Sequence, residues 1–186
     1  MFPLLTAVNT NENPPSEWVR RWLPTPTGHG RLLDFACGSG RHARLAAAMG
    51  YRVLALDRDP ACLALAGIPG IDARVTDLEA GAWDWCAERF AVIVVTRYLF
   101  RSRLDLLMDL LADGGCLIYE TYAEGHGRYG KPSNPAFLLQ ADELLAVARR
   151  AALRVAAFEQ GMTLSPRPAL VQRMVAWRSN TPVVLR

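Results

Sequence analysis

The sequence predicts an α/β fold, a three-layer sandwich in which helices cover both faces of a mostly parallel sheet of about seven strands with an antiparallel last strand. Short, continuously apolar segments recur along the chain, which is typical of strands buried on both faces. Segments of helical composition separate most of them, as the right-handed crossovers of a parallel sheet require. The 186 residues fit one domain, which we expect to span residues 31–178 between an N-terminal extension with a short helix (1–30) and a C-terminal tail (179–186).

The expected strands are short apolar runs bounded by turn residues. In chain order they are 31–36, 51–56, 73–76, 90–96, 116–121, 154–159 and 169–177, of which 73–76 is the weakest. Gly38 and Gly40 follow the first run, and Asp57 ends the second. Only a turn-rich segment at 160–168 separates the last two runs, so we expect these two strands to pair antiparallel at one edge of the sheet.

The expected helices lie between these runs, at 16–23, 42–49, 59–66, 104–111 and 140–150. Ser16 can cap the first helix, whose tryptophans fall on one apolar stripe. The second is rich in alanine and leucine and ends at Gly50. Asp59 and Pro60 open the third, and a Gly-Gly turn stops the fourth.

Composition argues against several classes of function. The net charge is +3 and the basic residues form no dense run, unlike a dedicated nucleic-acid patch. The four cysteines, Cys37, Cys62, Cys86 and Cys116, form no C-x-x-C pattern, so we expect neither a disulfide framework nor a bound metal. The chain shows no signal-peptide pattern and no apolar stretch of the roughly 20 residues that cross a bilayer. We therefore expect a cytoplasmic protein without a membrane partner.

The strongest functional signal is the segment DFACGSGR, residues 34–41, at the end of the first expected strand. Gly38 and Gly40 lack Cβ atoms, so the backbone can turn tightly and a ligand can approach it closely. The next helix begins here, and its free N–H groups favour polar or anionic ligand groups. In a doubly wound sheet, the carboxyl ends of the first strands form a ligand-binding crevice, to which Asp34 adds a carboxylate. The alternative is an ordinary strand–turn–helix whose glycines serve packing.

Two further acids follow the next strands. Asp57 lies roughly 20 residues beyond the glycines, where a carboxylate can accept hydrogen bonds from both ribose hydroxyls of a nucleoside. Asp77 follows the third strand and can meet an adenine edge, with Leu78 against the ring face. The alternatives are that Asp57 caps the turn at Asp59 and that Asp77 is a solvated loop residue.

Together these features resemble the class I S-adenosylmethionine-dependent methyltransferases, over about residues 30–178, and most of all the small tellurite-resistance-type members. The loop at 34–40 is similar to the family's acidic-x-Gly-x-Gly-x-Gly motif, with Ala36 in place of the first glycine. The resemblance implies a Rossmann-like fold, S-adenosylmethionine as the cofactor and methyl transfer as the activity. The cofactor-binding residues that it implies are Asp34, Ala36, Cys37, Gly38, Gly40, Arg41, Asp57, Arg58, Asp77, Leu78 and Thr96.

The resemblance leaves the methyl acceptor open. No Asn/Asp-Pro-Pro-aromatic motif follows the fourth strand, where the chain has Thr96-Arg97-Tyr98-Leu99, and this argues against amino-methylation of adenine or glutamine. A small molecule is the acceptor that we expect first, with a protein or nucleic acid as the alternatives. The segment 121–134 is rich in glycine, proline, aromatic and charged residues and is expected to form an active-site lid.

Residues after the fourth and fifth strands are the candidates for the acceptor side. Tyr98, Glu120 and His126 are candidate catalytic residues, with His126 as a proton acceptor near neutral pH. The candidate substrate-binding residues are Arg101, Tyr122, Arg128 and Tyr129. The alternatives are that His126 is a solvated loop histidine and that Tyr98 and Arg101 cap the helix that follows.

Two other functions fit parts of the pattern. The spacing Gly38-x-Gly40-x-x-Ala43, together with Asp57, also matches the fingerprint of nicotinamide-dependent oxidoreductases. Against this, the chain has no Tyr-x-x-x-Lys pair, because its single lysine is Lys131 on the expected lid. A catalytically silent binding subunit that keeps the fold is the second alternative.

Overall fold

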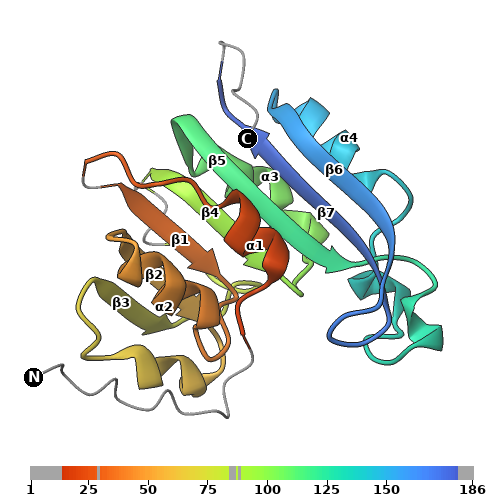
Figure 1. Ribbon diagram of the computed structural model, residues 1–186, viewed down its shortest axis with the longest axis horizontal. Helices are drawn as coiled ribbons and strands as arrows, with labels where there is room; N and C mark the ends of the chain where they lie inside the picture. Colours follow the sequence, from red (N-terminus) through yellow and green to blue (C-terminus); the bar gives the residue numbers. More distant parts are fainter. Residues whose placement is uncertain (1–13, 29, 84–86, 88, 180–186) are drawn as a thin grey trace, which may run out of the picture.

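The computed structural model describes residues 14–28, 30–83, 87 and 89–179, which are built around one seven-stranded sheet (Figure 1). The strands are β1 (Arg31–Phe35), β2 (Arg52–Asp57), β3 (Ile71–Val75), β4 (Phe90–Thr96), β5 (Leu111–Tyr122), β6 (Arg154–Thr163) and β7 (Ala169–Trp177). Their order is β3-β2-β1-β4-β5-β7-β6. Strands β1 to β5 pair in parallel, whereas β7 runs antiparallel to β5 and β6. The predicted sheet is confirmed.

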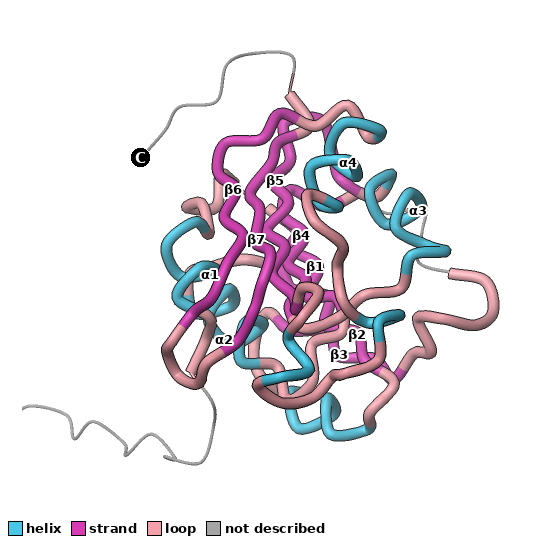
Figure 2. The backbone as a smooth tube through the Cα atoms, turned by 90° about the vertical axis from the view of Figure 1, so that its right-hand side faces the viewer, coloured by secondary structure: helices cyan, strands magenta, loops and turns pink. Residues whose placement is uncertain are grey.

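Helices cover both faces of the sheet and give the three predicted layers (Figure 2). One face carries α1 (Glu17–Trp22), α2 (Arg41–Ala48) and the 3-10 helix η1 (Pro60–Leu65). The other face carries α3 (Leu104–Asp109) and α4 (Glu143–Arg150). Three single-turn 3-10 helices lie in the connections: η2 (Arg101–Arg103), η3 (His126–Arg128) and η4 (Pro135–Phe137).

Strand β1 shows why these strands have continuous apolar sequences. Leu32 and Leu33 point to opposite faces of the sheet and pack in different core clusters, yet each is fully buried. Burying one such side chain stabilises the fold by about 1.5–3 kcal/mol. A polar residue at either position would lose that contribution. Polar and apolar residues therefore do not alternate along this strand, as they would in a strand with one face exposed to solvent.

The N-terminal extension takes part in the same core. Ser16 caps α1 as predicted, because its hydroxyl accepts a hydrogen bond from Trp18 N at 3.2 Å. Trp18 and Trp22 are buried in the cluster that contains Leu32 of β1. The start of α1 also reaches β5, where the Ser16 hydroxyl donates to Glu120 Oε1 at 2.9 Å.

Several element boundaries differ from those expected from the sequence. Strand β5 begins at Leu111, where a helix was expected to end, because Leu111 pairs with Phe90. The register then shifts, so that Cys116 is the next partner, facing Val92. Strand β6 continues through the expected turn to Thr163, since it keeps its pairing with β7 to that point.

The sequence suggested neither a disulfide framework, nor a metal site, nor a membrane span. Cys37, Cys62 and Cys116 are buried free thiols, while Cys86 and the tail from residue 180 onward lie outside the described residues. No three His, Cys, Asp or Glu side chains within the described ranges gather closely enough to hold a metal ion. In that same part of the chain, no helix combines the length and apolar character needed to span a bilayer.

Candidate functional site

A cavity of about 490 Å³ opens at the carboxyl edge of the parallel strands, where a doubly wound sheet binds its ligands. Its lining residues end or follow β1 to β5 and come from the segment after β5. They are Ala36, Cys37, Gly38, Ser39, Arg41, Asp57, Arg58, Asp77, Leu78, Glu79, Thr96, Arg97, Tyr98, Leu99, Thr121, Tyr122, Pro132 and Phe137. Of the eleven predicted cofactor-binding residues, all but Asp34 and Gly40 line it.

The glycine-rich loop forms the middle of the cavity wall. Ala36 and Gly38 both have left-handed backbone, with φ of 57° and 55°, so the alanine occupies a conformation that favours the family's glycine. A Cβ atom on Gly38 would meet nothing within 4 Å, which leaves its backbone open to the cavity. Gly40 serves packing instead, because its Cα faces the side chain of Leu65 in η1.

Asp34 lies beneath the loop and does not line the cavity. Its carboxylate is 1% exposed and accepts a hydrogen bond from Ala43 N at 2.9 Å, which holds the first turn of α2 against β1. Burial raises the pKa of this carboxyl to about 7, although the Ala43 hydrogen bond and the Arg41 charge act in the opposite direction. Asp34 is therefore a residue that positions the loop.

The pKa of Asp34 predicts a pH-dependent stability. Between the unperturbed pKa near 3.8 and the folded value of about 7, the folded state binds more protons, so the free energy of unfolding falls as the pH rises. Asp34→Asn keeps an oxygen acceptor for Ala43 and removes the titration. From about pH 4 to about pH 7, the wild type should therefore lose stability relative to the variant, by about 1.4 kcal/mol per pH unit, with little further change above pH 7. Urea unfolding of both proteins measures this, and parallel pH profiles would contradict it.

Asp57 caps the turn at Asp59, which the sequence offered as one of its two roles. Its Oδ2 accepts from Gly38 N at 2.7 Å and its Oδ1 from Asp59 N at 2.8 Å, so it fixes the loop and the turn before η1. It also lines the cavity. Because a carboxylate has about four acceptor positions, two of them remain for ligand hydroxyls. Arg58, the next residue, lines the same end.

Asp77 and Tyr98 both line the cavity, at its end next to β3. Asp77 Oδ1 accepts from Glu79 N and Ala80 N, as a turn residue does, at 2.9 and 3.2 Å. The Tyr98 ring packs edge-on against Phe35, and its hydroxyl is buried without a hydrogen-bond partner among the described residues. Burial and the charges of Glu79 and Asp77 raise the pKa of this hydroxyl. The geometry thus places it beside these acids, away from the expected acceptor side.

The opposite end of the cavity, next to β4 and β5, was predicted only in part. Thr96 and Tyr122 line it as expected. Arg97 was not predicted, although it directly follows Thr96. It has a left-handed backbone with φ of 56°, and its N–H donates to Glu120 O at 2.9 Å. A non-glycine residue held in this conformation is often part of a functional site.

Glu120 and His126, both predicted to be catalytic, do not line the cavity. Glu120 accepts from the Ser16 hydroxyl and lies 3.6 Å from Arg173, so its carboxylate is already engaged. His126 is 4% exposed and stacks on Tyr122, with ring centroids 4.0 Å apart. Its Nδ1 accepts from Leu170 N at 3.3 Å, which leaves Nε2–H to face Lys131 O at 3.3 Å. Both ring nitrogens face backbone groups of the protein, so the ring is not the solvated loop histidine of the alternative, and neither nitrogen is free to act on a ligand.

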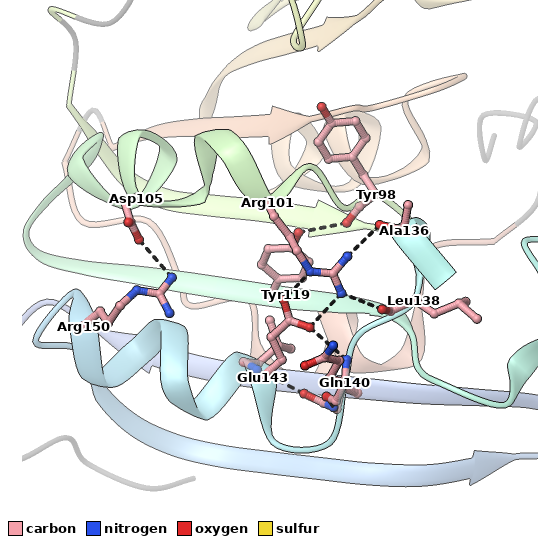
Figure 3. A network of polar contacts seen from close by, with 11 residues as sticks. Tyr98, Arg101, Asp105, Tyr119, Ala136, Leu138, Gln140, Glu143 and Arg150 are labelled. Atoms are coloured by element: carbon pink, nitrogen blue, oxygen red, sulfur yellow. Dashed lines mark hydrogen bonds and ion pairs between the residues drawn. The ribbon is translucent and has the colours of Figure 1, made fainter. Parts of the chain in front are cut away.

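Arg101 is a structural clamp and not part of the cavity wall (Figure 3). Its Nε and one terminal nitrogen donate to the two oxygens of Glu143 at 2.7 and 2.8 Å. The terminal nitrogens also donate to Ala136 O and Leu138 O, both at 2.7 Å, and so tie the segment after β5 to α4. Arg128 lines a separate cavity of about 300 Å³, and Tyr129 is 47% exposed outside both cavities.

His42 links α1 to the cavity wall and was not predicted from the sequence. It is 2% exposed, and its Nε2 accepts from Ser16 N at 3.1 Å. The other nitrogen, Nδ1, must then carry the proton and lies 3.5 Å from Thr96 Oγ1. Burial and the nearby charges of Arg41 and Arg97 lower the pKa of His42 to about 3, so the ring is neutral at physiological pH.

The fold and cavity can be compared with known proteins. No model of a protein family and no curated protein matches the sequence. TehB from Haemophilus influenzae is similar in structure, with a TM-score of 0.63 and 16% identity over 87% of this chain and 65% of that one. A TehB-like S-adenosylmethionine-dependent methyltransferase from Corynebacterium glutamicum has a TM-score of 0.62 and 19% identity, over 86% and 85% of the two chains.

A third similar structure is the 1,6-didemethyltoxoflavin-N1-methyltransferase from Burkholderia thailandensis, solved with 1,6-didemethyltoxoflavin and S-adenosylhomocysteine bound. Its TM-score is 0.61 at 16% identity, over 82% of this chain and 72% of that one. This chain spans 65% of the length of TehB and larger shares of the other two. The likeness confirms, for the fold, the resemblance to the methyltransferases that the sequence predicted.

Proposed function

Starting from the methyltransferase fold, we propose that this protein binds S-adenosylmethionine and transfers its methyl group to a small-molecule acceptor. The observation that carries the proposal is the cavity at the carboxyl edge of the sheet, in which the bare backbone of Gly38 lies 2.7 Å from the carboxylate of Asp57. The methyltransferase whose structure holds S-adenosylhomocysteine and a small aromatic substrate supports both parts of the proposal.

The residues along the cavity fit an adenosyl cofactor. Asp57 has acceptor positions left for the two ribose hydroxyls. Beyond it, the Tyr98 hydroxyl is buried and has no partner in the described part of the chain, which costs about 1–3 kcal/mol unless a ligand or water satisfies it. A purine edge between Tyr98 and Asp77 would satisfy this group, with Leu78, itself 4% exposed, beside the ring. The volume of about 490 Å³ is within the range of small-molecule sites.

Bound S-adenosylmethionine would supply an electrophilic methyl group on a sulfonium. The chain's own contribution is alignment and exclusion of water, which can lower a barrier by several kcal/mol. Leu170 N donates to His126 Nδ1, Glu120 is engaged by Ser16 and Arg173, and neither residue lines the cavity. We therefore expect an acceptor that needs no strong base from these two residues.

Tyr98→Phe should affect the stability of the free protein and its affinity for the cofactor in different ways. Removing the unpaired hydroxyl should leave the free energy of unfolding unchanged or raise it by about 1 kcal/mol. The same change should weaken binding of S-adenosylhomocysteine severalfold, because the adenine edge loses a partner. Thermal unfolding and isothermal titration measure the two effects. Equal cofactor affinity in the variant would show that this hydroxyl does not contact the cofactor.

Incubation with S-adenosylmethionine labelled in its methyl group tests the function directly. Pools of small metabolites should yield a labelled low-molecular-weight product. Label found only in added protein or RNA would contradict the small-molecule part of the proposal. Binding of S-adenosylhomocysteine without transfer to any of the three acceptor classes would favour the catalytically silent alternative.

A further inference from the structure

The carboxylates that line the cavity are confined to one end, where Arg58 also lies. The acids that line it, Asp57, Asp77 and Glu79, all end or follow β2 and β3. Two arginines, Arg41 and Arg97, line the end next to β4 and β5, and no carboxylate among the described lining residues lies at that end. The order of the strands keeps the two ends apart, because β1 lies between β2 and β4.

The guanidinium of Arg97 is free to bind a ligand. It is exposed, and it makes no hydrogen bond or ion pair within the described part of the chain. Its backbone is fixed by the hydrogen bond to Glu120 O in a left-handed conformation. The side chain of Glu120 is engaged by Ser16 and Arg173 and makes no ion pair with Arg97.

Arg41 adds a second positive charge to this end. It is half-buried, and its terminal nitrogen donates to Pro14 O at 3.1 Å. Burial and the charge of Arg97 lower the pKa of Arg41, which means that its charged form is partly desolvated and repelled by its neighbour. A bound anion would relieve this repulsion, and a guanidinium pairs with a carboxylate in a bidentate geometry.

Beside Thr96 and Thr121, aromatic and apolar side chains line this end. Tyr122, Pro132 and Phe137 line it, and the stacking of Tyr122 on His126 holds the tyrosine ring in place. Phe137 is 46% exposed, so its ring gains burial when a ligand covers it. The wall therefore suits an organic body of low polarity, and the two arginines suit an anionic group attached to it.

The cofactor of the proposed function accounts for only one of the two arginines. Its methionine part carries one carboxylate, and its amino and sulfonium groups are both positive. Arg41 begins α2, the helix that follows the glycine-rich loop, and is the nearer of the two to that loop in sequence. Arg97, which follows β4, is left for the second ligand.

We propose that the methyl acceptor is an organic carboxylate, held at its carboxylate by Arg97 and at its apolar body by Tyr122 and Phe137. The inference rests on the proposed function, because it assumes that the cofactor fills the other end of the cavity. The carboxylate acts as the anchor of the substrate, so the methyl group is received elsewhere on the molecule.

Matched pairs of ligands test this assignment. The protein saturated with S-adenosylhomocysteine is titrated calorimetrically with benzoate, phenylacetate and 3-phenylpropionate, and with the primary amide of each acid. At least one acid should bind tenfold or more tightly than its amide. Added salt should weaken the acid and leave the amide unchanged, because exposed charges are screened. Equal binding of acids and amides, or no binding of any acid, would overturn the proposal.

A set of variants assigns the effect to Arg97. Arg97→Gln should weaken binding of the acid about tenfold or more while S-adenosylhomocysteine binds within about threefold of the wild type, and Arg97→Lys should restore part of the loss. Arg149→Gln, an exposed residue of α4 outside the cavity, makes the same change in net charge and should leave acid binding unaltered. Unchanged acid binding in Arg97→Gln would overturn the proposal. Failure of S-adenosylhomocysteine to bind the wild type would instead refute the proposed function.

Discussion

Gly40→Ala is expected to lower the free energy of unfolding by about 2–5 kcal/mol, through strain in the backbone and overpacking together. Gly40 has φ of 80°, a left-handed conformation that costs a residue with a Cβ atom about 1–2 kcal/mol. Its new Cβ would lie 2.7 Å from Leu65 Cγ and closer still to the methyl groups. Leu65 is fully buried, so it cannot move aside without disturbing the core between η1 and α2.

Two further variants separate these causes. Gly38→Ala has a comparable φ of 55° and no neighbour within 4 Å, so it should cost only the backbone term and weaken cofactor binding instead. In the double variant Gly40→Ala/Leu65→Ala the overpacking is relieved. Its loss in the free energy of unfolding should therefore be clearly smaller than the sum of the losses in Gly40→Ala and in Leu65→Ala. Urea unfolding of the wild type, the three single variants Gly40→Ala, Gly38→Ala and Leu65→Ala, and the double variant measures these losses. Additive losses would show that contact with Leu65 is not the reason for a glycine at position 40.

Asp57→Ala is expected to weaken binding of S-adenosylhomocysteine at least tenfold, which corresponds to about 1.4 kcal/mol. The substitution removes the acceptors proposed for the ribose hydroxyls. It also releases Gly38 N, which donates to Asp57 at 2.7 Å, so the loop that faces the ligand loses its anchor. Both effects act in the same direction, and calorimetric titration measures their sum.

Asp59→Ala is the matched control for this variant. Asp59 is also an acid after β2, but its carboxylate accepts from Ala61 N at 2.9 Å to cap η1 and does not line the cavity. Its loss should cost about 1 kcal/mol of stability and leave the affinity within twofold. If both variants weaken binding equally, the effect comes from the turn before η1 and not from a contact of Asp57 with the ligand.

The sequence predicts the sheet well, and it also predicts that Gly38 and Asp57 come together in the cavity wall, because local rules govern both. Continuous apolar strands, helices between them and the Gly38 loop are each specified by neighbouring residues. Parallel pairing then brings the ends of β1 and β2 together, and with them Gly38 and Asp57. The position of Asp57 beside the loop therefore follows from its place at the end of the strand that pairs with β1.

The side chains after β4 and β5 were predicted less well, because distant residues decide what each of them contacts. Glu120 lies at a strand end, as expected, but Ser16 from the N-terminal extension occupies its carboxylate. His126 is buried because Leu170 of β7 donates to it. Arg101 faces Glu143 of α4 and so leaves the cavity. None of these partners lies within ten residues of the side chain that it engages, so periodicity and motif spacing carry no signal for them.

Calorimetric titration of the wild-type protein with S-adenosylhomocysteine and with NADH tests the central claim most directly. The claim is that the cavity between the Gly38 loop and Asp57 holds the adenosyl group of a methyl donor. It predicts one molecule of S-adenosylhomocysteine bound per chain, and no detectable heat from NADH under the same conditions. Binding of NADH without S-adenosylhomocysteine would contradict the claim and favour the oxidoreductase that the glycine spacing also fits.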